Sequence, residues 1–399
     1  MFSFVMAYII AMASLARRAV KRTCDSRHRK IVIFDPDTDP RKHDSIAESC
    51  GGCVKKALPL INAAACIFPE EDQAMALLAQ RGEVKWIEDD TVFEIVDTPA
   101  PDVTERARCF GVKHPGFSTQ TTPWGVAKIN TPSAWTRATG KGVRVGVVDT
   151  GVNMGHPDLA ENVKAGFDAI SETEGVEDDN GHGTHVAGII AALDNGFGVV
   201  GVAPDAHVYA VKSFDSKGKG MASDIIQGIA WCIDQGVRII NMSFGTVDSG
   251  KALELAISKA AESGILLVAA SGNTGGQNTV LYPARDPHVV AVAASTEDDK
   301  IAAFSSSGPE INVTGPGTDI YSTYTGQRYK TLSGTSMACP HVTGVAALVF
   351  SVAPDLSARD VEEVICETAT AISGFPREQQ GAGLVNAWEA VASAVENRL

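Results

Sequence analysis

The sequence predicts an α/β protein with a doubly wound, mostly parallel β-sheet, preceded by a small α+β domain. Two observations carry this prediction. After residue 119, short β-branched runs alternate with helical patterns, which is the order expected of a parallel sheet covered by helices. Between residues 30 and 96, two helical patterns separate strand-like runs, which predicts the order βαββαβ of a ferredoxin-like domain or its truncated relative.

Composition bounds the class of protein. The chain has 399 residues and is 44% hydrophobic, enough for a large core and more than one domain. No run of 18 apolar residues occurs, so we expect no stable membrane span. After residue 118 there are 31 Asp and Glu against 18 Lys and Arg, compared with 17 against 16 before it. This acidic balance argues against a nucleic-acid partner and suits carboxylates that hold cations.

The eight cysteines do not form a disulfide scaffold. Three of them lie in the acidic C-terminal part, and this odd number leaves at least one free thiol there unless it pairs with the N-terminal part or another chain. Cys50 and Cys53 have the CxxC spacing of a redox or half-zinc site, but no second CxxC or HxxxH pair follows. We therefore do not favour a functional role for this pair.

Residues 1–29 have features of an imperfect signal for export. The first 16 residues are largely apolar, and Ala11-Met12-Ala13 is typical of a small-residue cleavage site. The basic residues follow the apolar run instead of preceding it, so the signal is incomplete. We expect an exported protein, in the medium or the cell envelope, with a cytoplasmic location as the alternative.

A small domain is expected over residues 30–96, followed by a linker over 97–118. The linker is rich in proline and has no periodicity, so we expect it to be exposed and accessible to proteases. The elements expected in the small domain are a strand Lys30–Phe34, a helix Asp39–Cys50, a strand Ala57–Phe68, a helix Glu70–Arg81 and a closing strand Val84–Val96 that is interrupted by Glu88-Asp89-Asp90.

The large domain is expected over residues 119–399. In open parallel sheets, chemistry gathers at the carboxyl ends of the strands, so residues directly after each strand are candidates for a site. The expected strands are 143–148, 208–212, 237–242, 265–270 and 288–293, and the expected helices are 185–193, 222–235, 251–263, 337–351 and 358–369.

The stretch from Gly334 to His341 (GTSMACPH) places Ser336 near the start of a helix. Small residues flank the serine, and Pro340 precedes a helical pattern, as proline is tolerated in a first turn. Free backbone N–H groups at such a helix start can receive a developing negative charge. An ordinary N-cap serine is the alternative that this stretch alone leaves open.

Two predicted strands end in polar residues. Asp149 follows the strand 143–148, where a buried carboxylate needs a partner to offset its desolvation, although a salt bridge or a helix cap would also serve. Asn273 follows the strand 265–270, where its amide can either stabilise an oxyanion or form a turn.

Two histidines, His182 and His185, lie at a glycine-flanked helix start. Metal binding is one interpretation, but the HxxH spacing lacks the i, i+4 pair and the glutamate of a zinc-protease helix. We favour a histidine that is oriented by Asp149 and faces Ser336.

These residues, in the chain order Asp, His, Asn, Ser, resemble the subtilisin family of serine proteases. The resemblance runs from about residue 119 to residue 399 and implies the subtilisin fold, with catalysis assigned to His182 and a structural role to His185. The matching segments are VDTG at 148–151, HGTHVAG at 182–188, SGN at 271–273 and GTSMACPH at 334–341.

The resemblance implies an acyl-transfer mechanism. Ser336 would attack the peptide carbonyl while His182 takes its proton, and Asp149 would orient His182 and stabilise the imidazolium. The side chain of Asn273 and the backbone N–H of Ser336 would hold the oxyanion. In this family, loss of the amide donor costs about 2.7–4 kcal/mol of transition-state stabilisation.

The resemblance also implies a cleft for polypeptide substrates. Two backbone segments would pair with an extended substrate, and a shallow, uncharged pocket closed by Leu281 would take a medium apolar residue before the scissile bond. The substrate-binding residues implied are Gly218, Lys219, Gly220, Ser243, Phe244, Gly245, Ala270, Ser271, Gly272 and Leu281.

A structural calcium ion is implied in the same way. Three side chains and three carbonyls would supply six oxygens, within the range that Ca²⁺ accepts. A glycine-asparagine turn and a salt-bridged aspartate are the alternative, and no organic cofactor is expected. The ligands implied are the side chains of Gln120, Asp158 and Asn195 and the carbonyls of Leu193, Phe197 and Val199.

The small domain resembles, more loosely, the subtilisin propeptide. Residues 30–96 would then act as an intramolecular chaperone and inhibitor whose last strand leads into the active site. We expect self-cleavage at Val96–Asp97 or Phe117–Ser118 and a monomer after processing. A catalytically silent scaffold would need to lack a catalytic residue, and a cysteine or zinc enzyme built on Cys339 or the histidines would need partners that the spacing does not provide.

Overall fold

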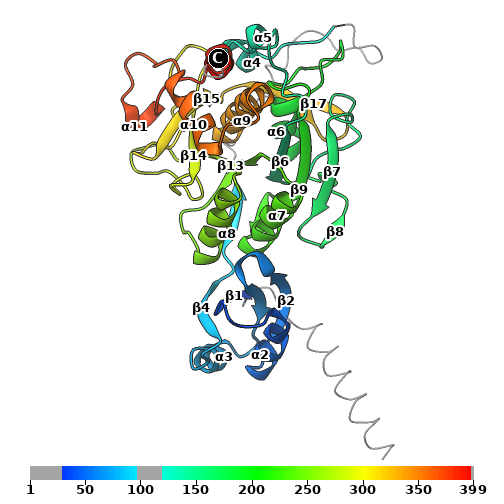
Figure 1. Cartoon of the computed structure of the whole chain (residues 1–399), viewed down its shortest axis with the longest axis vertical. Coiled ribbons are helices and arrows are strands. Elements are labelled where there is room, and N and C mark those ends of the chain that lie inside the picture. Colours follow the sequence, from blue (N-terminus) through cyan, green and yellow to red (C-terminus); the bar gives the residue numbers. More distant parts are fainter. Residues whose placement is uncertain (1–28, 97–118, 397–399) are drawn as a thin grey trace, which may run out of the picture. The chain divides into compact units, whose positions relative to one another are not determined.

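The computed structural model describes residues 29–96 and 119–396 (Figure 1). The chain divides into two compact units, one reaching to Thr91 together with Gly250–Ala252, and the other comprising the remainder from Val92 onward. The segments in which a signal and a linker are expected, up to residue 28 and from 97 to 118, lie outside the described residues.

The first unit is an antiparallel four-stranded sheet with two helices, in the predicted order βαββαβ. Its strands are arranged β2-β3-β1-β4, and β1 pairs with both β3 and β4. The element bounds are β1 Arg29–Phe34, α2 His43–Ser49, β2 Cys53–Leu58, β3 Ala63–Ile67, α3 Glu71–Leu78 and β4 Val84–Asp89.

One predicted long strand is wrong as a single element. The expected strand Ala57–Phe68 contains the end of β2, a 3-10 turn that starts at Pro59, and β3, because Asn62 takes the left-handed conformation with φ 48° and the chain reverses there. The interruption expected within Val84–Val96 is confirmed, since β4 ends at Asp89. The second half of this stretch, β5 (Val92–Ile95), belongs to the other unit.

The second unit confirms the predicted doubly wound sheet. Eight strands lie in the order β15-β14-β13-β11-β6-β9-β7-β8, and every neighbouring pair is parallel except β7 with β8. The bounds are β6 Arg144–Asp149, β7 Val163–Asp168, β8 Thr173–Glu174, β9 His207–Lys212, β11 Ile239–Met242, β13 Leu266–Ala270, β14 Val289–Ser295 and β15 Ile311–Pro316.

Helices cover both faces of this sheet. Alternate strand residues such as Val145 and Val147 share one core cluster with α6, α9, α10 and α12, whereas Gly146 between them faces Cys232 of α7. The bounds are α4 Trp124–Lys128, α5 Thr131–Ala134, α6 His182–Ala191, α7 Ala222–Asp234, α8 Lys251–Glu262, α9 Thr335–Val352, α10 Ala358–Glu367, α11 Arg377–Gln380 and α12 Ala387–Glu396.

Helix α9 is the central element of the core. Its side chains from Thr335 to Phe350 are all buried, which explains why the helix is apolar on every face. It is also the one helix among the described residues with the length and composition of a membrane span, but its window is 89% buried inside the protein. This burial identifies α9 as a core helix.

The cysteines in the described residues are all free thiols, namely Cys50, Cys53, Cys66, Cys232, Cys339 and Cys366. Within residues 29–96 and 119–396, no group of three His, Cys, Asp or Glu side chains gathers that could hold a metal ion. The CxxC pair therefore has no metal-binding partners in the part of the chain that the structure describes.

The buried histidine of α9 predicts a loss of stability in acid. Burial of His341 lowers its pKa from 6.5 to about 4. Between these pH values the unfolded chain binds a proton that the folded chain does not, so the free energy of unfolding falls as the pH falls through this window. The loss from this residue is about 2 kcal/mol between pH 6.5 and pH 5.

We expect His341→Gln to reduce that loss. Guanidinium unfolding at pH 7 and pH 5 should show a smaller drop in the free energy of unfolding for the variant than for the wild type. Equal drops would show that His341 does not carry this pH dependence.

Candidate active site

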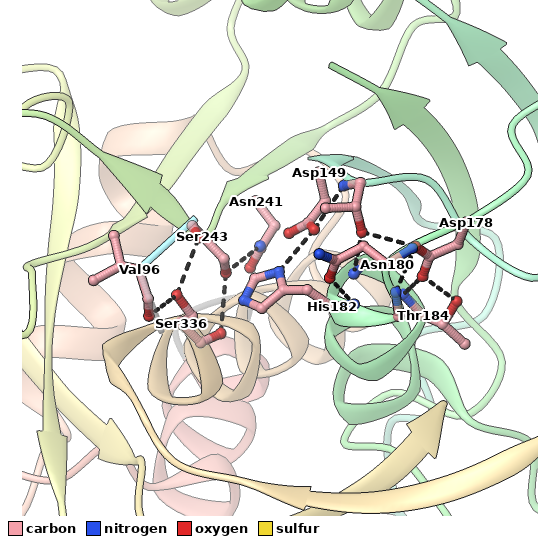
Figure 2. Close-up of polar contacts among 12 residues, drawn as sticks. Val96, Asp149, Asp178, Asn180, His182, Thr184, Asn241, Ser243 and Ser336 are labelled. Carbon is pink, nitrogen blue, oxygen red and sulfur yellow. Dashed lines mark hydrogen bonds and ion pairs between the residues drawn. The ribbon is translucent and has the colours of Figure 1, made fainter. Parts of the chain in front are cut away.

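Asp149 and His182 are brought together by the end of a central strand and the start of a helix. Asp149 is the last residue of β6, and His182 is the first residue of α6. The Nδ1 atom of His182 lies 2.7 Å from Oδ1 of Asp149, and both side chains are buried (Figure 2). The same Asp149 oxygen accepts a hydrogen bond from the backbone N–H of Thr150 at 2.7 Å. The carboxylate is therefore fixed from its own backbone as well as by the imidazole.

Asp178 fixes the turn that leads into His182. Its carboxylate accepts hydrogen bonds from the backbone N–H groups of Asn180, Gly181 and Thr184, and from two hydroxyl groups, those of Thr150 and Thr184. The Thr150 hydroxyl ties this turn to the residue next to Asp149. Sequence reasoning missed Asp178, which lies four residues before the first residue of α6 and outside the N-cap position, held by Gly181.

A hairpin holds the same segment from outside. Strands β16 (Ile320–Tyr324) and β17 (Arg328–Leu332) pair antiparallel. Hydroxyl groups in and just after β16 donate to backbone carbonyls around His182, in the pairs Ser322 to His185, Thr323 to Thr184, Tyr324 to Asn180 and Thr325 to Asp178. Sequence reasoning missed this hairpin, because its residues show neither strict alternation nor a buried run.

Ser336 is the second residue of α9, as the sequence predicted. Its hydroxyl Oγ lies 2.7 Å from the carbonyl oxygen of Val96 and 3.0 Å from that of Ser243. Figure 2 shows the imidazole of His182 between Asp149 and Ser336. The structure thus brings the acid, the histidine and the serine to the same edge of the sheet.

Asn273 follows β13 and also reaches the carbonyl of Val96. Its Nδ2 donates to Val96 O at 2.8 Å. Its Oδ1 accepts from both the N–H and the hydroxyl of Thr335, each at 2.9 Å. With Oδ1 occupied by two donors, the NH₂ group is directed at Val96. Thr335, which sequence reasoning missed, therefore sets the orientation of this amide.

The two segments expected to pair with a substrate enclose strand β5. Strand β10 (Lys219–Met221) and strand β12 (Phe244–Gly245) both pair with β5 in antiparallel fashion. The carbonyl of Gly218 accepts from Ile95 N at 3.0 Å, and that of Ser243 lies 3.5 Å from Val96 N. An extended chain therefore occupies this cleft and ends with its carbonyl at Ser336 and Asn273.

Leu281 lies against the glycines expected to flank the pocket. A Cβ atom at Gly245 would lie 2.9 Å from Leu281 Cβ, and one at Gly272 would lie 2.8 Å from Leu281 Cγ. Ala270 and Ser271 are fully buried beside them. Of the predicted substrate-binding residues, Lys219, Gly220, Phe244 and Gly245 belong to the strands that pair with β5.

A second apolar contact lies further back along β5. Phe93 is fully buried and meets Phe244 edge-to-face, with ring centroids 6.0 Å apart. Phe244 packs in turn on Phe214 at 4.9 Å. Sequence reasoning did not single out this aromatic cluster, because its members are distant along the chain.

Most of the residues expected to bind calcium contact one another. The amide nitrogen of Gln120 lies 2.7 Å from Leu193 O and 3.4 Å from Val199 O. Asn195 Nδ2 donates to Asp158 Oδ1 at 3.1 Å. The sixth residue, Phe197, lies in the same loop, where its N–H donates to Asn195 Oδ1 at 3.2 Å.

The chemistry of this group fits a hard cation. Asp158 is fully buried, and its carboxylate accepts hydrogen bonds from the neutral donors Val199 N–H, Tyr329 O–H and Asn195 Nδ2. Among the described residues, no Lys or Arg forms an ion pair with it. The carbonyl oxygens of Leu193 and Val199 face the amide nitrogen of Gln120, whose own oxygen accepts a hydrogen bond from Gly196 N. Neutral oxygens and a carboxylate are the ligand types that Ca²⁺ prefers.

Comparison with known proteins identifies the family. The sequence profile of the Subtilase family matches residues 140–384. The chain is 50% identical over 272 residues to a thermostable alkaline protease of Halalkalibacterium halodurans, covering 68% of this chain and 74% of that protein. It is 37% identical over 396 residues to subtilisin E of Bacillus subtilis, covering 97% of this chain and 96% of that protein.

Subtilisin BL of Lederbergia lenta is 43% identical over 269 residues, which are 67% of this chain and 98% of that protein. The match to subtilisin E extends over both units of the structure, whereas the match to subtilisin BL spans about two thirds of the chain. The chain belongs to the subtilase family and is a serine endopeptidase.

Proposed function

We propose that this endopeptidase uses Ser336, His182 and Asp149 as its catalytic triad and is made as a zymogen that cuts itself. One observation carries the proposal. The carbonyl oxygen of Val96 lies 2.7 Å from Ser336 Oγ and 2.8 Å from Asn273 Nδ2, so a peptide group of the chain itself occupies the position of a substrate carbonyl.

The chemistry follows from these positions. Ser336 Oγ attacks the carbonyl carbon while His182 takes its proton, and the carbonyl oxygen gains negative charge where Asn273 donates. The backbone N–H of Ser336, at the start of α9, is the second donor expected there. His182 then gives its proton to the leaving amine, and water releases the acyl-enzyme. Asp149, held by Thr150 N–H, keeps His182 Nδ1 protonated and stabilises the imidazolium.

The position of Val96 favours Val96–Asp97 over Phe117–Ser118 as the first processing bond. Strand β5 is paired on both sides, as a bound substrate would be, and Val96 is the last residue before Asp97. After cleavage, residues 30–96 would remain as an inhibitor that fills the cleft. The protein's own N-terminal domain is thus the first partner of the active site, and the processed enzyme is expected to be a monomer.

Replacement of the nucleophile tests self-processing. We expect Ser336→Ala to remain a full-length precursor, because no acyl-enzyme can form, whereas the wild type should yield a fragment beginning at Asp97. Intact mass and N-terminal sequencing measure both products. Ser351→Ala, on the same helix but away from the site, should be processed like the wild type. If the Ser336→Ala variant were cut at Val96–Asp97 as fast as the wild type, the proposal would be contradicted.

The cleft predicts a preference at two substrate positions. Val96 marks the residue before the scissile bond, and Phe93, three residues earlier, is buried against Phe244. Burial of a phenylalanine side chain contributes about 1.5–3 kcal/mol. We expect a peptide with Phe at that earlier position and Val before the scissile bond to be cleaved efficiently. Its kcat/KM should be roughly tenfold or more above that of the same peptide with Ala in place of Phe. Equal values, measured with chromogenic peptides, would contradict this assignment.

We also propose that Gln120, Asp158, Leu193, Asn195, Phe197 and Val199 hold one structural Ca²⁺. When bound, the ion would neutralise the buried carboxylate of Asp158 and tie Gln120 to the loop that contains Asn195. Its effect is on stability, because the site is built from loop residues that the triad does not include.

Removal of calcium should lower thermal stability. At a free Ca²⁺ concentration of 100 times Kd, binding stabilises the fold by about 2.7 kcal/mol. For a domain of this size we expect EDTA to lower the thermal midpoint by roughly 5–10 °C. Asp158→Asn should have a low midpoint that no longer depends on EDTA. A wild-type thermal midpoint that EDTA does not change would refute the proposed calcium site.

We infer export from the signal-like features of residues 1–29, and N-terminal sequencing of the protein from cell and medium fractions would test it.

A catalytically silent scaffold is the second class of function. Only an activated serine reacts with a fluorophosphonate, so labelling of Ser336 separates the two classes.

A further inference from the structure

Pro340 leaves the carbonyl of Ser336 without its normal helical partner. Proline has no N–H group, so it cannot donate to the carbonyl four residues earlier in the helix. Helix α9 nevertheless continues through Pro340. The carbonyl oxygen of Ser336 instead accepts a hydrogen bond from the hydroxyl of Ser243 at 3.0 Å.

Ser243 is held in turn by Asn241, the buried asparagine of β11. Asn241 Nδ2 donates to Ser243 Oγ at 2.9 Å (Figure 2). Because this bond occupies the hydroxyl as an acceptor, its single hydrogen is available for Ser336 O. Asn241 and Ser243 are both fully buried, so water does not compete for these bonds.

Two donors from α9 fix the orientation of the Asn241 amide. Its Oδ1 accepts from the hydroxyl of Thr343 at 2.9 Å and from the thiol of Cys339 at 3.3 Å. Burial raises the pKa of Cys339 to about 12, so the thiol keeps the proton that it donates. With Oδ1 occupied in this way, the NH₂ group must face Ser243. Cys339 therefore acts as a hydrogen-bond donor that helps to orient the amide.

We propose that Asn241 is a positioning residue for the nucleophile, acting through Ser243 on the carbonyl of Ser336. This inference rests on the proposed role of Ser336. The chain of bonds ties the first turn of α9 to the central strand β11 at the point where Pro340 removes a helical bond. It thereby holds the backbone of the residue that supplies both the attacking oxygen and an oxyanion N–H.

The contacts of the cleft predict which kinetic constant changes. Ser243 meets the bound strand through its backbone carbonyl, which lies 3.5 Å from Val96 N, whereas its side chain faces Asn241 and Ser336. Loss of the side-chain bonds should therefore slow acylation and lower kcat, with little effect on KM.

A double-mutant cycle tests the proposal. Asn241→Asp keeps the shape of the side chain but removes the donor, so the Ser243 hydroxyl would turn toward the new carboxylate and leave Ser336 O. Ser243→Ala removes the same bond directly. We expect each variant to lower kcat about tenfold or more, with KM changed less than twofold. The double variant should be no slower than the slower single variant, because both interrupt one path. Losses that multiply in the double variant would overturn the proposal.

Thr314→Val is the matched control. It removes a buried hydrogen bond, from the Thr314 hydroxyl to Gln380 O at 2.9 Å, that lies outside this chain of bonds. The variant should keep kcat within twofold of the wild type while the thermal midpoint falls. A loss of kcat as large as that of Asn241→Asp would show a general packing effect and overturn the proposal. If Asn241→Asp does not fold, a Ser243→Ala variant with unchanged kcat would overturn it alone.

Fluorophosphonate labelling of the wild type separates this inference from the proposed function. Suppose that the wild type cleaves peptides and is labelled at Ser336, but the kcat losses of Asn241→Asp and Ser243→Ala multiply in the double variant. This outcome refutes only the role of Asn241. A wild type labelled at another residue refutes the proposed triad and this inference with it.

Discussion

The burial of helix α9 against the central parallel strands is the constraint on which the rest of the site depends. Every side chain from Thr335 to Phe350 is buried, so this helix cannot shift without repacking the core. Ser336 is its second residue, Asp149 is the last residue of β6, and Asn273 follows β13 of the same sheet. The candidate catalytic groups are therefore positioned by the most densely packed part of the fold, which gives the precision that acyl transfer requires.

Two glycine residues of α6 allow this helix to approach β6 and β16 closely. A Cβ atom at Gly183 would lie 2.1 Å from the carbonyl oxygen of Gly151 and 3.1 Å from Asp149 Cβ, so a side chain there would push the start of α6 away from β6. Gly188 has the same relation to Thr323 of β16, at 2.1 Å. Both glycines belong to the stretch HGTHVAG, whose physical role is thus packing as well as chemistry.

The position of Val96 connects the proposed substrate and inhibitor roles of β5. A strand that pairs on both sides and places its carbonyl at Ser336 and Asn273 has the geometry of a substrate before cleavage. Once the bond after Val96 is cut, the same pairing would retain the product. Recognition through backbone hydrogen bonds explains how one cleft can serve the chain's own strand and other polypeptides.

The sequence by itself determined the fold class and the candidate catalytic residues. The central strands and long helices were predictable because each is a continuous apolar run or a clear helical period, and Asp149, His182, Asn273 and Ser336 each follow a strand or begin a helix. Strand β7 and the edge strand β15 were missed because they contain Gly, Asp or Pro and lack such a run.

Only the tertiary structure decided how these residues are held. Asp178, Thr335 and Asn241 act through hydrogen bonds to groups that become their neighbours only when the chain folds. No local sequence pattern predicts such bonds. The structure also decided which carbonyl group of the described residues lies at Ser336, because strand pairing, not composition, brings Val96 there. Local periodicity reports on burial and secondary structure, whereas the orientation of a buried amide or hydroxyl depends on donors that meet only after folding.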